Sequence, residues 1–87
     1  MGLFGDDKKV SKDELKDVRS RLSQKGFDKT ELDDVDKVFH GELNERGGGA
    51  TAKDVKDNVD WMRKNMGKHH FSKEEIDRIE QEMKKKL

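Results

Sequence analysis

The chain has 87 residues, of which 29% are hydrophobic and 46% charged, with 20 basic and 20 acidic side chains. A net charge of zero argues against a surface devoted as a whole to nucleic acid or membrane, because such surfaces carry excess lysine and arginine. Cysteine is absent, which excludes disulfides, a thiolate nucleophile and a cysteine-based zinc site. With no proline and abundant lysine, glutamate and leucine, the composition favours helices in one small domain.

No part of the sequence resembles a membrane-spanning or secretory segment. No apolar run approaches the roughly 18 residues that a membrane helix needs, and the first residues contain no long apolar stretch. We therefore expect a cytoplasmic protein that makes no membrane contact.

The first predicted helix spans residues 11–25. Residues 1–10 contain two glycines and several charges, which predicts a flexible N-terminal arm. Ser11 and Glu14 have the spacing of a capping box, and Gly26 provides a stop signal. The apolar stripe between them consists of Leu15, Val18 and Leu22.

The second predicted helix spans residues 29–45, with Asp28 and Thr30 as competing N-caps. Gly41 lies inside it and should fray or bend its last turn. A glycine-rich loop at 47–50 then ends the helix, because consecutive glycines lose too much backbone entropy in a helix. The apolar stripe consists of Leu32, Val35, Phe39 and Leu43.

Two further helices are predicted at 51–66 and 72–87. Thr51 with Asp54 forms a weaker cap, and Ser72 with Glu75 forms a full capping box. Gly67 is the expected stop of the first of these helices. The two apolar stripes consist of Val55, Val59, Met62 and Met66, and of Ile76, Ile79, Met83 and Leu87.

Four amphipathic helices must bury their stripes against one another, which predicts an all-α fold. We expect a compact bundle of four short helices in a single domain at 11–87. It would consist of helical hairpins at 11–46 and 51–87, joined by the glycine-rich loop. The apolar stripes of the two hairpins do not align well enough to indicate a repeat.

The sequence contains no pattern typical of a catalytic, metal or cofactor site. The histidines His40, His69 and His70 lack the spacing of a metal pair on one helix face. The acidic segment 28–39 lacks the ligand positions of a calcium loop, and Gly47–Gly49 lacks the rest of a P-loop. We therefore expect no enzymatic activity, no metal and no cofactor.

Charge is distributed unevenly, since residues 62–87 carry eight basic and five acidic side chains. The loop at 63–73 before the last helix could contact phosphates, which makes a weak nucleic-acid-binding domain the alternative hypothesis. The candidate contact residues are Arg63, Lys64, Lys68, His69, His70 and Lys73.

Protein binding is the first hypothesis for function. Trp61 lies at the edge of the apolar stripe of its helix, and edge tryptophans often anchor interfaces. Met62 and Met66 beside it have the adaptable side chains that binding grooves use. We therefore expect a non-enzymatic helical interaction module that receives a protein partner, or a second copy of itself, at Trp61, Met62 and Met66.

Overall fold

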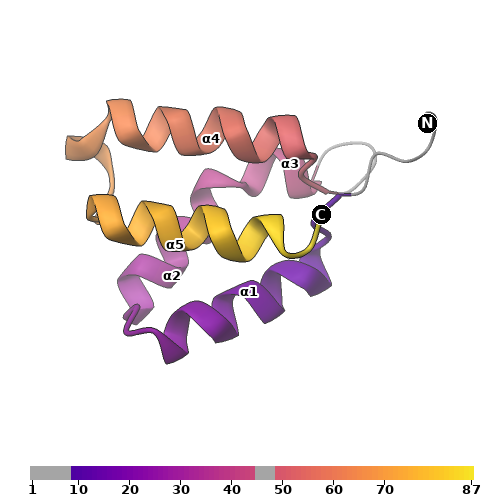
Figure 1. Ribbon diagram of the computed structural model, residues 1–87, viewed down its shortest axis with the longest axis horizontal. Helices are drawn as coiled ribbons and strands as arrows, with labels where there is room; N and C mark the ends of the chain where they lie inside the picture. Colours follow the sequence, from indigo (N-terminus) through magenta and orange to yellow (C-terminus); the bar gives the residue numbers. More distant parts are fainter. Residues whose placement is uncertain (1–8, 45–48) are drawn as a thin grey trace.

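The computed structural model describes residues 9–44 and 49–87 and is all-α, as predicted. Helix α5 lies between α4 and α1, and α2 and α3 lie behind them (Figure 1). The elements are α1 (Lys12–Gln24), α2 (Lys29–Val38), α3 (His40–Asn44), α4 (Ala52–Lys64), the short 3₁₀ helix η1 (Met66–Lys68) and α5 (Lys73–Lys84).

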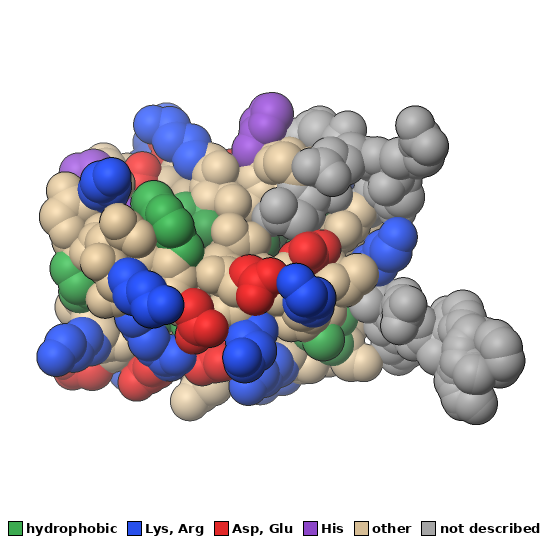
Figure 2. Space-filling model, turned by 90° about the horizontal axis from the view of Figure 1, so that it is seen from above, with side chains coloured by type: hydrophobic (Ala, Val, Ile, Leu, Met, Phe, Trp, Pro, Cys, Tyr) green, Lys and Arg blue, Asp and Glu red, His purple; other side chains and the backbone are tan. Residues whose placement is uncertain are grey.

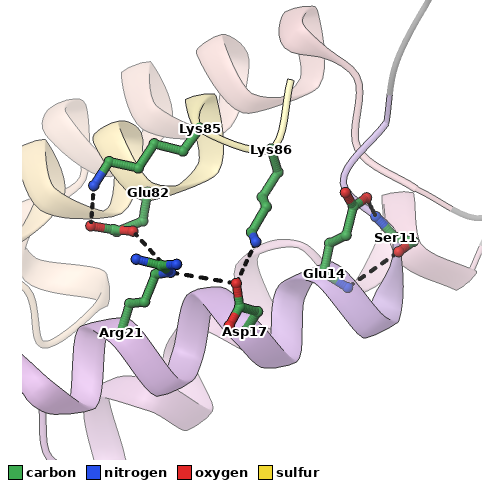
Figure 3. Close-up of polar contacts among 7 residues, drawn as sticks. All are labelled: Ser11, Glu14, Asp17, Arg21, Glu82, Lys85 and Lys86. Carbon is green, nitrogen blue, oxygen red and sulfur yellow. Dashed lines mark hydrogen bonds and ion pairs between the residues drawn. The ribbon is translucent and has the colours of Figure 1, made fainter.

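Each of the four longer helices begins with a capping box. The cap side chain accepts a hydrogen bond from the backbone N–H three residues on, and the carboxylate of that residue accepts one from the cap's own N–H. Figure 3 shows this exchange between Ser11 and Glu14. The predicted caps are confirmed, and Asp28 rather than Thr30 is the cap of α2. The four caps are Ser11, Asp28, Thr51 and Ser72.

Two helices differ from the prediction near their C-terminal ends. The predicted helix 29–45 is interrupted at Phe39, where the backbone (φ −98°, ψ 8°) separates α2 from α3, two residues before Gly41. Helix α4 ends at Lys64, earlier than the Gly67 stop predicts. Asn65 leaves the helical conformation there (φ −125°, ψ 49°), and its side-chain amide donates to the carbonyl of Trp61 at 2.8 Å. A side-chain hydrogen bond therefore caps α4 before the glycine is reached.

The core extends beyond the four helices to the segments that precede α1 and α4. Val10 and Ala50 are fully buried and exchange two backbone hydrogen bonds, of 2.8 and 3.1 Å, in an antiparallel bridge. Gly49 lies so close to this bridge that a Cβ there would stand 2.7 Å from the Cβ of Lys9. The predicted arm at 1–10 is thus too long, and Ala50 belongs to the core rather than to a free loop. Residues 1–8, Gly47 and Gly48 lie outside the described residues.

The two hairpins are related in sequence, although not at one fixed spacing. Thr51 stands 40 residues after Ser11, whereas Phe71 stands 44 residues after Phe27, because the loop between α4 and α5 is longer than the loop between α1 and α2. This difference hides the repeat from a search at one period. Identical residues occur at corresponding positions in and just before α2 and α5. The pairs are Phe27 and Phe71, Lys29 and Lys73, Glu31 and Glu75, and Asp33 and Asp77.

Several corresponding residues contact each other across the two hairpins. Val10 bridges Ala50, and the rings of Phe27 and Phe71 lie 6.1 Å apart. The carboxyl groups of Glu31 and Glu75 lie close enough for each to shift the pKa of the other. Contacts between counterparts are what an approximate twofold axis produces. The fold is therefore two related hairpins packed face to face around one core.

Glu82 is a charged residue inside this core, with 1% of its surface exposed. Its Oε2 lies 3.2 Å from the Nζ of Lys85, and its Oε1 lies 4.0 Å from the Nε of Arg21 (Figure 3). The Nζ of Lys25 lies 3.5 Å from Oε2. Burial alone would raise the pKa of Glu82, but the hydrogen bond from Lys85 and the charges of Lys85 and Lys25 outweigh it and lower the pKa. Glu82 therefore joins α5 to the end of α1 as a carboxylate.

We predict that Glu82→Gln lowers the free energy of unfolding by about 1–2 kcal/mol at pH 7, because the amide keeps the shape and loses the charge. Because the pKa of Glu82 is lowered, its ionised form stabilises the fold above the ordinary value of 4.5, and this stabilisation is lost on acidification. The difference in unfolding free energy between Glu82→Gln and wild type should therefore shrink below pH 4.5. Urea unfolding at pH 7 and pH 3.5 measures both effects. Glu82→Met, which removes the polar group, should cost less than Glu82→Gln. A penalty for Glu82→Gln that is equal at both pH values would contradict this role.

The carboxyl pair of Glu31 and Glu75 lies where α2 and α5 begin. The hydrogen bond with Glu75 and burial raise the pKa of Glu31. Burial would raise the pKa of Glu75 as well, but hydrogen bonds from Glu31 and Ser72 lower it. The two carboxyl groups therefore titrate as a pair, and their charges repel when both groups are ionised.

We predict that Glu31→Gln raises the free energy of unfolding by about 0.5 kcal/mol at pH 7, because glutamine keeps the capping box and removes the repulsion. Because the pKa of Glu31 is raised, its protonated form stabilises the fold at low pH, and this stabilisation is lost as the pH rises and the group ionises. The gain in unfolding free energy from Glu31→Gln should therefore vanish near pH 4. Thermal unfolding across this pH range measures it. Glu14→Gln, at the corresponding position of α1, is the control and should bring no gain at pH 7; equal gains in both variants would rule out the pair as the cause.

Candidate functional site

Trp61 and Met66 are the large hydrophobic side chains that the described part of the chain leaves exposed, at 41% and 37%. Trp61 lies in the last turn of α4, and Met66 begins η1 just beyond it. Met62, the third residue of the predicted contact, is fully buried in the core. The structure thus places Trp61 and Met66 on the surface and Met62 in the interior, so we leave Met62 out of the candidate surface. We call Trp61 and Met66 together the Trp61 surface.

His69 connects this surface to the core. Its Nε2 donates to the carbonyl of Met62 at 2.7 Å, and its Nδ1 accepts from the backbone N–H of Phe71 at 3.1 Å. These two bonds fix the ring in one tautomer and orientation. Its centroid lies 6.1 Å from Trp61 and 5.1 Å from Phe71, which in turn contacts Phe27. A row of four rings therefore leads from the exposed tryptophan to the buried interface between the hairpins.

We predict that His69→Ala lowers the free energy of unfolding by about 1–2 kcal/mol, because two hydrogen bonds to backbone groups are lost together. The same variant should shift the emission spectrum of Trp61, which loses its ring neighbour. His70→Ala is the matched control, because the His70 side chain is 63% exposed and pairs with Asp34, which is a surface contact, so its cost should stay below about 1 kcal/mol. Urea unfolding followed by tryptophan fluorescence measures both variants, and equal losses would contradict the role assigned to His69.

Half of the candidate residues in the predicted basic loop are engaged within the protein, since Arg63, His69 and His70 contact other groups of the chain. Arg63 lies 2.8 Å from Asp77 and 3.0 Å from Glu80, and these hydrogen bonds raise the pKa of Arg63. His70 contacts Asp34 through its Nδ1 at 2.5 Å and through its backbone N–H at 3.2 Å.

Three candidate residues of this loop remain as exposed cations with no carboxylate within 4 Å in residues 9–44 and 49–87. They are Lys64, Lys68 and Lys73. Basic and acidic side chains alternate over the face seen in Figure 2 and form no continuous basic stripe there.

His40 lies on a different part of the fold from His69 and His70. His40 begins α3, whereas His69 and His70 follow η1 in the loop before α5. Within the described residues, no three His, Cys, Asp or Glu side chains are grouped in a way that could hold a metal ion. The helices of the same residues are also too short or too polar to cross a membrane.

A second surface feature is a groove of about 290 Å³ between α1 and the α2–α3 segment. Leu15 and Leu43 form its apolar part, and both are nearly buried. Sequence reasoning missed this groove, because its residues come from three helices and no local pattern connects them. Its lining consists of Lys12, Leu15, Lys16, Arg19, Asp36, His40 and Leu43.

Comparison with known proteins gives no relative: no protein-family model, no curated protein and no solved structure matches the chain.

Proposed function

We propose that this chain is a non-enzymatic helical interaction module that binds a protein partner through the Trp61 surface. The observation that carries the proposal is the 41% exposure of Trp61, whose ring contacts His69 at a defined position. Exposed tryptophan and methionine leave apolar area in water that a partner can bury at roughly 25 cal/mol per Å². Tryptophan is also the residue type most enriched among energetically dominant interface contacts.

The ring of His69, which two hydrogen bonds to backbone groups hold in place, lies 6.1 Å from that of Trp61. This contact restricts part of the freedom of the indole, which lowers the entropy cost of association. Met66, on the shorter η1, supplies a side chain that adapts to the partner's shape.

Nucleic-acid binding is the weaker alternative. Arg63 and His70 would have to leave their carboxylate partners to reach phosphate groups. The three exposed lysines of the loop can release about three counterions, which gives weak binding that falls further as salt rises. Protein binding at Trp61 and Met66 requires no such ion pair to break, because both side chains are already exposed.

We predict that a photo-crosslinking amino acid at Lys64, beside the Trp61 surface, yields a discrete protein adduct in an extract of the native cells. Trp61→Ala in the same protein should remove most of that adduct, because the main apolar contact is lost. Unfolding curves should show a change below about 1 kcal/mol for Trp61→Ala, since the side chain is largely at the surface. Denaturing gels followed by mass spectrometry measure the adduct.

The control is the same crosslinker at Lys53, an exposed position near the other end of α4, where no adduct that depends on Trp61 should form. Adducts from position 64 that persist with Trp61→Ala at intact fold would contradict the proposal. Adducts to nucleic acid that disappear in Lys64→Glu/Lys68→Glu, with the crosslinker moved to Lys73, would favour the alternative instead.

A further inference from the structure

The groove between α1 and the α2–α3 segment combines an apolar floor with a cationic rim. Leu15 and Leu43, which are 4% and 7% exposed, line it from opposite helices. Lys12 and Lys16 stand one helical turn apart on the exposed side of α1 and line its edge. In the described part of the chain, neither lysine has a carboxylate within 4 Å.

The net charge of the lining is positive. Three cations face one carboxylate, Asp36, whose Oδ2 lies 3.2 Å from Arg19. Arg19 also lies 3.6 Å from Asp33, so its guanidinium is held against α2. Lys12 and Lys16 are therefore the charges that remain available to a molecule entering the groove.

The groove lies in the first hairpin, where α1 and α2 contact each other less than α4 and α5 do in the second. In both hairpins, an arginine of the first helix pairs with two carboxylates of the second. In the second hairpin, Arg63 binds Asp77 and Glu80, which are the counterparts of Asp33 and Asp36. The second helix of the first hairpin is interrupted at Phe39, which separates α2 from α3, whereas α5 of the second hairpin is continuous.

Size decides which kind of occupant fits. Pockets for whole small-molecule ligands typically measure about 300–1,000 Å³, and this groove lies at the lower limit. It can accept one or two large apolar side chains that project from a longer segment. The lysines at the rim would then face the residues next to those side chains, which favours carboxylates at these positions.

We propose that this groove is a second binding site, which receives a peptide segment with apolar side chains flanked by aspartate or glutamate. Leu15 and Leu43 contact the apolar side chains, and Lys12 and Lys16 pair with the carboxylates. The site is separate from the Trp61 surface, and its existence does not depend on the function proposed for that surface.

The test uses the full chain and a fluorescein-labelled peptide in which Leu-Phe stands between two pairs of aspartates, with binding followed by fluorescence anisotropy at low salt. Lys12→Glu/Lys16→Glu should weaken binding by at least about tenfold, because two attractions become repulsions. Lys64→Glu/Lys68→Glu is the matched control, since it makes the same change in charge at two exposed lysines outside the groove, and it should leave affinity within about twofold. Circular dichroism checks that both variants keep their helices.

A second peptide, with Ser-Ser in place of Leu-Phe, separates the apolar contribution from simple charge attraction. It should bind at least about tenfold more weakly than the Leu-Phe peptide. The proposal is overturned if the Leu-Phe peptide does not bind at concentrations on the order of 1 mM. It is equally overturned if both charge variants weaken binding to the same extent, or if the two peptides bind equally well.

Discussion

The burial of one face of α5 between α4 and α1 is the constraint on which the rest of the structure depends. Ile76, Ile79 and Met83 have no exposed surface, and each such side chain contributes roughly 1.5–3 kcal/mol by leaving water. Glu82 lies on the same helix and is held by cations from α1 and from the end of α5 itself. Because α5 contacts a helix from each hairpin, it ties the two hairpins into one core.

The relation between the hairpins explains where the candidate surface lies. At the 40-residue spacing that relates the N-caps of α1 and α4, Leu22 corresponds to Met62, and both side chains are fully buried. Met66 comes after the end of α4 and is 37% exposed. The longer loop after α4 contains η1 and His69, and it carries Met66 to the surface. The two hairpins thus share their core contacts and differ in the segments that face outward.

Local chemistry made most of the helix starts predictable from the sequence. Capping boxes at Ser11, Thr51 and Ser72 depend on residues three apart, so their spacing is visible in the chain itself. The ends of α2 and α4 were less predictable. The break at Phe39 follows no glycine or proline, and the cap from Asn65 depends on a side-chain rotamer that sequence does not specify.

Features that join distant segments could not be predicted. The bridge between Val10 and Ala50 and the contact between Phe27 and Phe71 depend on how the hairpins meet. For the candidate surface, the edge position predicted for Trp61 agrees with its exposure. The burial of Met62 and the two backbone hydrogen bonds of His69 depend on how the loop before α5 packs, which no local pattern specifies. The residues that line the groove beside α1 come from three helices, so the sequence of no single helix predicts it.

The most direct test of the central claim, that the Trp61 surface binds a protein, is an NMR spectrum of the isotopically labelled full chain in an extract of its native cells. The account predicts selective shifts or broadening of the Trp61 indole N–H and the Met66 methyl signals, while Lys64, Lys68 and Lys73 change little and nuclease treatment has no effect. Changes concentrated at those lysines and abolished by nuclease, or spectra identical to those in buffer, would contradict it.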